Sequence, residues 1–208
     1  MAQLDPERVR LCVVTSNGFV PGRGHRDVAL AAIQGGATAI QLRAPELPDP
    51  ALTRVVEELT GPCREAGALL LVNDRVEVAA GAGVGAHVGQ EDDPAGARGV
   101  LGPDAVLGIS VATPEEALAA EAAGADYLGV TVWATPTKVD AIPRGLDGLR
   151  AIVDAVEVPV VGIGGIDVAN ARLVLDAGAV GVAVVSAVAA APNMVAATRR
   201  LLEIVEGR

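Results

Sequence analysis

Two acidic residues close neighbouring apolar runs and could together bind a divalent cation. Asp74 closely follows the run Leu69–Val72, and Asp92 follows the run Gly85–Val88. If the two runs are parallel strands joined by a short helix, both carboxylates lie at the same edge of the sheet. They then need a cation, a shared proton or solvent between them. Magnesium takes one or two protein carboxylates and completes its shell with water and phosphate oxygens. The pair predicts an Mg2+ site, and capping of the following helices by these aspartates is the alternative.

Two short segments near the end of the chain could bind phosphate through backbone N–H groups. Gly164 and Gly165 follow an apolar run and precede a helical segment, and Val185 and Ser186 follow the next apolar run. Phosphate sites recur at the loops after the seventh and eighth strands of α/β barrels. A tight turn would also explain the two glycines, so this interpretation depends on both segments together.

A third segment combines two hydroxyls with the single lysine of the chain. Thr135, Thr137 and Lys138 lie within four residues, and the other fifteen of the sixteen basic residues are arginine. A lysine ammonium acts as a compact point charge. Schiff-base lysines are usually desolvated to lower their pKa, whereas this one stands in a polar segment. We therefore predict that the segment binds an anion, and an inert surface lysine is the alternative.

The elements that would position these residues alternate along the chain. Helical segments repeatedly end in glycine and are followed by a short apolar run, a pattern typical of a helix C-cap followed by a strand. The predicted strands are Val9–Ser16, Ala39–Arg43, Leu69–Asp74, Gly85–Gly89, Val106–Ser110, Tyr127–Thr131, Pro159–Gly165 and Gly181–Ser186. The clearest predicted helices are His25–Gly35, Pro50–Ala66, Pro114–Ala123, Gly145–Val156, Val168–Ala177 and Asn193–Val205. Only short helices fit after the third and fourth strands.

This alternation predicts an α/β fold, a single (β/α)8 TIM barrel, with residues 1–208 as one domain. An open doubly wound sheet is the alternative, and it is weaker because no Gly-x-Gly-x-x-Gly turn follows the first strand. Barrel active sites lie at the carboxyl ends of the strands. Polar residues at or near those ends include Thr15, Gln41, Arg43, Asn73, His87, Ser110, Thr131 and Ser186. His87 lies inside a strand, so it is either a satisfied core histidine or a contact to the ligand, and we count it as a candidate substrate-binding residue.

Composition and charge narrow the classes of partner. The formal net charge of −10 argues against nucleic acid, whose phosphates attract basic surfaces, but it allows a small phosphorylated ligand. Cys12 and Cys63 are predicted to be buried free thiols. The sequence shows no basic-then-apolar leader and no apolar run long enough to span a bilayer, so we expect a cytoplasmic protein with no membrane partner. The sequence leaves the oligomeric state open, a homo-oligomer included.

Together these motifs resemble the thiamine-phosphate synthase family. Their order and spacing match that family from about Leu11 to Ala187, nearly the whole chain. The combination of Gly-Gln-Glu-Asp with Thr-Pro-Thr-Lys is fairly specific. The matching segments are Asn73-Asp74-Arg75, His87-x-Gly89-Gln90-Glu91-Asp92, Thr135-Pro136-Thr137-Lys138, Gly162-Ile163-Gly164-Gly165-Ile166 with Asn170, and Val185-Ser186.

The resemblance implies a transferase that joins hydroxymethylpyrimidine diphosphate to thiazole phosphate, giving thiamine phosphate and pyrophosphate. In the family, Mg2+ holds the diphosphate through the two aspartates that match Asp74 and Asp92. The residues implied to contact the diphosphate, and so to be catalytic, are Arg43, Asn73, Ser110 and Lys138. Gln41 is implied to contact the pyrimidine. The residues implied to hold the thiazole phosphate and neighbouring groups are Thr135, Thr137, Gly165, Val185 and Ser186.

The sequence departs from the family pattern beside these motifs. Pro45 stands where the family usually has a second diphosphate-binding lysine, and Ala112 stands where a histidine often follows the strand-five serine. The proline-aromatic pair before Thr135 is also altered. Loss of one charged contact would cost about 1.5–3 kcal/mol, which weakens turnover without abolishing it. The alternatives are a thiazole tautomerase-like protein, which relies on the histidine that Ala112 replaces, and a non-catalytic paralogue that binds a phosphorylated ligand.

Overall fold

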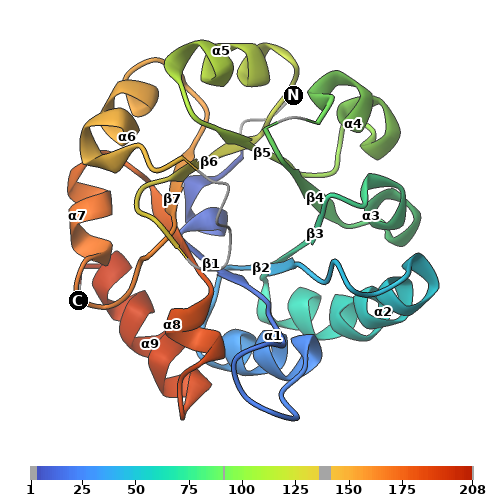
Figure 1. The fold of residues 1–208 in the computed structure, drawn as a ribbon. Coiled ribbons are helices and arrows are strands. Elements are labelled where there is room, and N and C mark those ends of the chain that lie inside the picture. The colour runs from blue at the N-terminus through green and yellow to red at the C-terminus, as the bar shows by residue number, and fades with distance from the viewer. Residues whose placement is uncertain (1–3, 91, 136–141, 208) are drawn as a thin grey trace.

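The computed structural model describes residues 4–90, 92–135 and 142–207, which form a closed barrel of parallel strands in the order β1-β2-β3-β4-β5-β6-β7-β8. Figure 1 shows the strands as a ring with the helices outside it. The strands are β1 Leu11–Val14, β2 Ala39–Leu42, β3 Leu69–Asn73, β4 Gly85–Val88, β5 Leu107–Val111, β6 Tyr127–Thr131, β7 Val160–Ile163 and β8 Gly181–Val184. The predicted (β/α)8 barrel is therefore confirmed, and the open doubly wound sheet is wrong.

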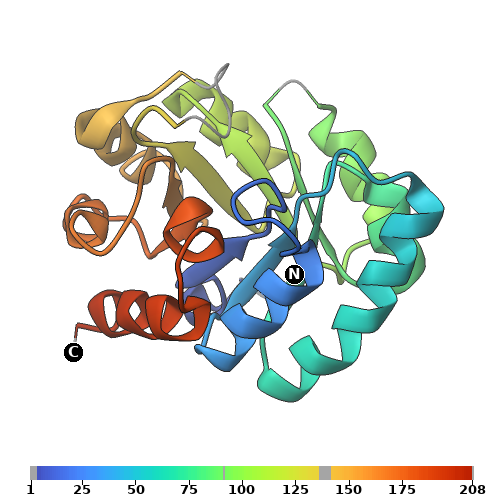
Figure 2. The ribbon, with the colours of Figure 1, turned by 60° about the horizontal axis from the view of Figure 1, so that its bottom comes forward.

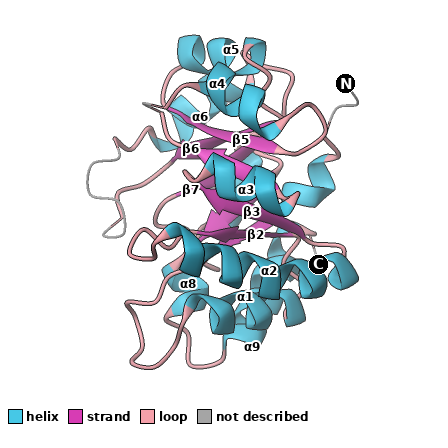
Figure 3. Ribbon diagram, turned by 90° about the vertical axis from the view of Figure 1, so that its right-hand side faces the viewer, coloured by secondary structure: helices cyan, strands magenta, loops and turns pink. Residues whose placement is uncertain are grey.

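A helix follows each strand and packs on the outside of the barrel, as Figures 2 and 3 show from two other directions. The helices are α1 His25–Gln34, α2 Asp49–Ala66, α3 Val76–Ala82, α4 Pro94–Leu101, α5 Pro114–Ala122, α6 Gly145–Val153, α7 Ala171–Asp176, α8 Ser186–Ala189 and α9 Met194–Val205. α2 and α3 end at Gly67 and Gly83, whose φ angles of +71° and +66° are the left-handed C-caps expected from the sequence.

Several element boundaries differ from the prediction, and β8 is the clearest case. The predicted strand Gly181–Ser186 ends at Val184, and the short helix α8 begins at Ser186. The segment from Ala179 to Ala191 is almost continuously apolar. Periodicity cannot separate a strand from a short buried helix in such a run.

The apolar side chains form two separate clusters. The larger cluster fills the layer between the strands and the surrounding helices, and it is built almost entirely from Val, Leu, Ile and Ala. The smaller cluster lies inside the barrel and includes Cys12, Val14, Leu71, Tyr127 and Val161. Residues near the N-terminus complete this inner cluster, because Leu4 and Val9 belong to it and Val9 lies on the short 3-10 helix η1 Pro6–Val9.

Both cysteines are buried and free, as predicted. Within the described ranges, no helix combines the length and the apolar character that crossing a membrane requires.

Candidate active site

One cavity of about 600 Å³ opens at the carboxyl ends of the strands. Every strand contributes to its lining, for example through Cys12, Gln41, Asn73, His87, Ser110, Tyr127, Ile163 and Ala183. The sequence-predicted site residues that line this cavity are Gln41, Arg43, Asn73, Asp74, His87, Asp92, Ser110, Thr135, Gly165, Val185 and Ser186. Thr137 and Lys138 lie outside the described residues. The cavity thus brings together candidates that are separated by up to 145 positions in the chain.

Asp74 reaches the mouth of the cavity through an uncommon backbone conformation. Its φ is +64°, and it is the one non-glycine residue with positive φ among those described. This conformation costs roughly 1–2 kcal/mol in an L-residue. The N-cap residues of α3 and α4 are Arg75 and Asp93, and neither makes a side-chain capping bond. Neither Asp74 nor Asp92 is therefore the N-cap residue of the helix that follows it, and Asp93 is exposed.

The donor set at the mouth fits a hard divalent cation. Asp74 and Asp92 are both exposed and line the same cavity. The Gly89 N–H donates to Oδ2 of Asp92 over 2.6 Å, which holds this carboxylate against its own loop. In the described part of the chain, no cluster of three or more His, Cys, Asp or Glu side chains is placed to hold a metal. Two carboxylates at one cavity mouth suit Mg2+, which completes its shell with water and ligand phosphates.

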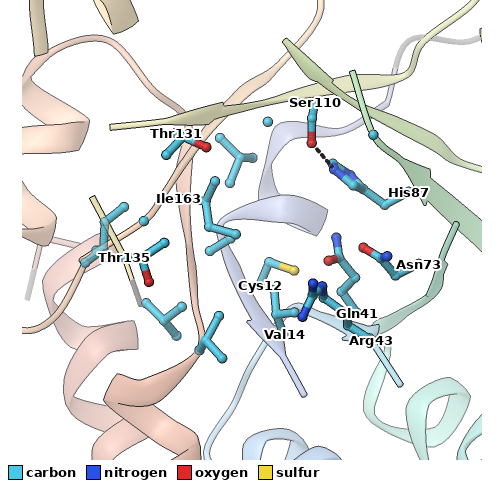
Figure 4. A pocket seen from close by; sticks show the side chains of 18 of the residues that line it. Cys12, Val14, Gln41, Arg43, Asn73, His87, Ser110, Thr131, Thr135 and Ile163 are labelled. Carbon is cyan, nitrogen blue, oxygen red and sulfur yellow. Dashed lines mark hydrogen bonds between the residues drawn. The ribbon is translucent and has the colours of Figure 1, made fainter. Parts of the chain in front are cut away.

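The base of the cavity carries a hydrogen-bonded group centred on His87. Its Nδ1 lies 2.8 Å from the Tyr127 hydroxyl and its Nε2 lies 3.0 Å from Oγ of Ser110 (Figure 4). A Cβ at Gly108 would lie 2.2 Å from the Tyr127 ring and 2.5 Å from Nδ1 of His87. A glycine on β5 is therefore required for the two rings to meet, with their centroids 5.5 Å apart. His87 is thus satisfied by protein partners and also lines the cavity, and its contact to a ligand stays a prediction.

Burial keeps the base of the cavity uncharged. It raises the pKa of Cys12 to about 12 and the pKa of Tyr127 well above its usual value. The Gln41 side chain, 5% exposed, lies beside Tyr127 in the lining of the cavity. The Cys12 thiol and the Tyr127 phenol at the bottom of the cavity are therefore uncharged, whereas its mouth carries charged side chains. Sequence reasoning missed Cys12 and Tyr127, although Tyr127 is the only tyrosine and begins a predicted strand.

The opposite side of the cavity is formed by backbone rather than by charged side chains. Gly164 and Gly165 have φ angles of +93° and +63°, and a Cβ at Gly164 would lie 2.6 Å from the Trp133 carbonyl oxygen. The Asn170 side chain donates to the Gly165 carbonyl over 2.9 Å and holds the loop in this shape. Ser186 begins α8 with Val185 as its N-cap residue, directly after β8, the neighbour of β7. Both segments line the cavity, as the phosphate interpretation requires.

The fold and the site together define a (β/α)8-barrel enzyme whose cavity combines an acidic pair with glycine loops suited to phosphate. The chain matches the family described as "Thiamine monophosphate synthase" over residues 11–188. It is 50% identical to the thiamine-phosphate synthase of Moorella thermoacetica over 202 residues, covering 94% of this chain and 95% of that protein. It is 50% identical to the thiamine-phosphate synthase of Chloroflexus aurantiacus over 200 residues, covering 94% and 92%.

A solved structure agrees with these relatives. The thiamine phosphate pyrophosphorylase from Pyrococcus furiosus superposes with a TM-score of 0.89 at 41% identity, covering 97% of this chain and 98% of that one. The chain belongs to the thiamine monophosphate synthase family. It is accordingly a transferase of thiamine biosynthesis.

Proposed function

We propose that this protein joins hydroxymethylpyrimidine diphosphate to thiazole phosphate and releases thiamine phosphate and pyrophosphate. The observation that carries the proposal is that one cavity is lined both by Asp74 and Asp92 and by the loops of Gly165 and Ser186. Two phosphorylated substrates need two separate anion sites facing a shared space. Membership of the family supports the same reaction.

In this proposal the β2–β5 side of the cavity binds the diphosphate. Arg43, Asn73 and Ser110 would donate to its oxygens, and Asp74 and Asp92 would hold Mg2+. When bound, Mg2+ would neutralise charge on the departing pyrophosphate. The family assignment of Lys138 to the diphosphate, and of Thr137 to the thiazole phosphate and neighbouring groups, stays a prediction.

The other substrate would bind across the cavity. Backbone N–H groups near Gly165 and Ser186 would hold the thiazole phosphate, and Thr135 would contact neighbouring groups. The carbon–oxygen bond to pyrophosphate breaks first, and the thiazole nitrogen then captures the pyrimidine-methyl cation. The residues lining this space bring few general acids or bases, so catalysis would act through positioning and electrostatic stabilisation.

The base of the cavity suits the pyrimidine. Gln41 and His87 offer hydrogen-bonding groups to a neutral ring, and the elevated pKa values of Cys12 and Tyr127 keep their own charges out of this space. Because the Cys12 thiol and the Tyr127 phenol stay protonated, neither acts as an anionic nucleophile that would trap the pyrimidine-methyl cation before the thiazole does.

Neither alternative function gains support from the site. A thiazole tautomerase would need an acid–base group at position 112, where Ala112 presents a methyl group and its N–H donates to Oε2 of Glu116 over 2.7 Å. A non-catalytic binding protein would have no need of the carboxylate pair at the mouth. We therefore retain the synthase as the proposed function.

The direct test is synthesis by the purified protein. With both substrates and Mg2+, we expect thiamine phosphate and pyrophosphate to form in equal amounts. Absence of product, with both substrates shown to bind, would overturn the proposal and favour a binding protein.

The domain organisation, the cellular location and the oligomeric state are further proposals. We propose that residues 1–208 form one domain, because the described helices pack on the closed barrel or on one another. A cytoplasmic location is a prediction that cell fractionation would test. A homo-oligomeric state is a prediction that size-exclusion chromatography would test.

A further inference from the structure

A buried histidine joins the loop after β1 to the loop after β2. His25 is the first residue of α1 and is 7% exposed. Its Nδ1 lies 2.9 Å from Oγ1 of Thr15, and its Nε2 lies 2.7 Å from Oε1 of Glu46. Thr15 directly follows β1, whereas Glu46 stands four residues after β2. Both ring nitrogens are therefore used to hold two loops of the cavity mouth together.

This chain of hydrogen bonds ends on Arg43. The Arg43 backbone N–H donates to Oγ1 of Thr15 over 3.2 Å. At the other end, Nδ2 of Asn17 donates to the same Glu46 oxygen over 2.7 Å. Figure 4 shows the Arg43 side chain beside Gln41 at the cavity. A displacement of Glu46 would therefore be transmitted through His25 and Thr15 to the backbone that carries Arg43.

Pro45 gives the loop a preformed turn. The Leu47 N–H donates to the Ala44 carbonyl over 3.1 Å, which closes a four-residue turn with Pro45 in its second position. Proline is favoured at this position because its fixed φ matches the turn. Glu46 occupies the third position, so the turn positions its carboxylate to contact His25.

The Glu46 carboxylate is engaged by this network, because its Oε1 is hydrogen-bonded to both His25 and Asn17. Burial alone would raise the pKa of Glu46, but the hydrogen bonds from His25 and Asn17 outweigh it, and the pKa is lowered. An ionised carboxylate only accepts hydrogen bonds, so Nε2–H of His25 donates to it. Glu46 thus orients the imidazole toward Thr15.

We propose that His25 and Glu46 are positioning residues that hold Arg43 in the diphosphate site, on a turn that Pro45 preorganises. In this chain, one arginine whose backbone N–H is hydrogen-bonded to Thr15 takes the place of the arginine and lysine pair that the family usually has at this loop. The inference rests on the proposed function, because it assigns Arg43 to the pyrimidine diphosphate.

A double-mutant cycle with steady-state kinetics tests the proposal. We expect Glu46→Ala to lower kcat/KM for the pyrimidine diphosphate by about tenfold, because small displacements of a binding group carry large kinetic costs. The KM for the thiazole phosphate should not change. In the Arg43→Ala background, Glu46→Ala should cause no further loss, since the residue it positions is gone.

Two variants complete the design. Glu46→Gln keeps an acceptor oxygen for His25 and should restore most of the lost activity. Glu58→Ala is the matched control, because it removes an exposed carboxylate that pairs with Arg26, the neighbour of His25 on α1, and it should leave both substrates unaffected.

The outcomes distinguish a wrong assignment of Arg43 from a wrong assignment of its positioning residues. Full activity in Arg43→Ala would overturn the proposed role of Arg43 itself. If Arg43→Ala loses activity and Glu46→Ala causes a further loss in that background, only the positioning inference would be overturned. The inference would also be overturned if Glu46→Gln were as defective as Glu46→Ala, or if Glu46→Ala raised the KM of both substrates alike.

Discussion

The β2–β5 side of the cavity and the β7–β8 side would meet phosphate with different chemical groups. The first side presents side chains, among them Arg43, Asn73 and Asp74, whereas the second presents glycine backbone at Gly164 and Gly165. Figure 4 shows Arg43 and Asn73 on one side of the cavity and Thr135 on the other. A side-chain site depends on which groups are present, and a backbone site depends on the path of the chain. The two sides should therefore fail under different kinds of substitution.

The largest effect is expected from removing charge on the first side. Asp92→Asn keeps an oxygen that can accept from Gly89 but removes the negative charge that would hold Mg2+. We expect kcat/KM to fall by about 100-fold or more. The synthesis assay, repeated over a range of Mg2+ concentrations, measures the change.

Asp93→Asn is the control for this prediction, because Asp93 is exposed and makes no side-chain capping bond. It should behave like the wild type. Equal activity of Asp92→Asn and Asp93→Asn would remove Asp92 from the metal site and would end the contrast between the two sides.

The next effect is expected from adding a methyl group on the second side. Gly164→Ala places a Cβ 2.6 Å from the Trp133 carbonyl oxygen at a φ of +93°. The loop must shift, and a strain of about 1–2 kcal/mol should raise the KM for thiazole phosphate roughly tenfold. The KM for the pyrimidine diphosphate should not change.

Gly99→Ala tests whether any added methyl group has this effect. A Cβ at Gly99 meets nothing within 4 Å on α4, so this variant should have wild-type kinetics. If Gly164→Ala instead raised the KM for the pyrimidine diphosphate, the assignment of the two sides would have to be reversed.

A smaller effect is expected from Ser110→Ala. The change removes a hydroxyl at the cavity and leaves Nε2 of His87 without its 3.0 Å partner. We expect a loss of about 1.5 kcal/mol, or roughly tenfold, in kcat/KM for the pyrimidine diphosphate. Thr53→Ala, an exposed hydroxyl on α2, is the control. A loss that falls on thiazole phosphate would place Ser110 with the other side.

The smallest effect concerns the base of the cavity. The folded-state pKa of Cys12, about 12, lies above the unfolded-state value of about 8.5. Its contribution to stability is therefore complete below that unfolded-state value and is lost as the pH rises toward 12. We expect the thermal midpoint to fall above pH 9, and to fall less steeply in Cys12→Ala. Identical slopes in both proteins would contradict this account of the base.

The barrel and most of the cavity lining could be predicted from the sequence. Short apolar runs that end in polar residues identify strands and their carboxyl ends, so the sequence alone places Asp74, Asp92 and Gly165 at one edge of the sheet. Asn73 and Arg43 followed in the same way. The carboxyl ends of parallel strands meet at one edge whatever the remaining details, and this makes such predictions robust.

The base of the cavity and the His25 network could not be predicted in this way. Barrel strands are buried on both faces, so an apolar run does not reveal which side chains point inward. Cys12 and Tyr127 therefore looked like ordinary core residues. His25 and Glu46 are separated by 21 positions and meet only because the loops after β1 and β2 lie side by side.

The most direct test of this division is calorimetric titration of two variants with two ligands. Arg43→Ala should lose affinity for pyrophosphate with Mg2+ and keep its affinity for thiazole phosphate, whereas Gly164→Ala should show the reverse. If both variants weakened the same ligand, or if each weakened both ligands equally, the cavity would not be divided as proposed.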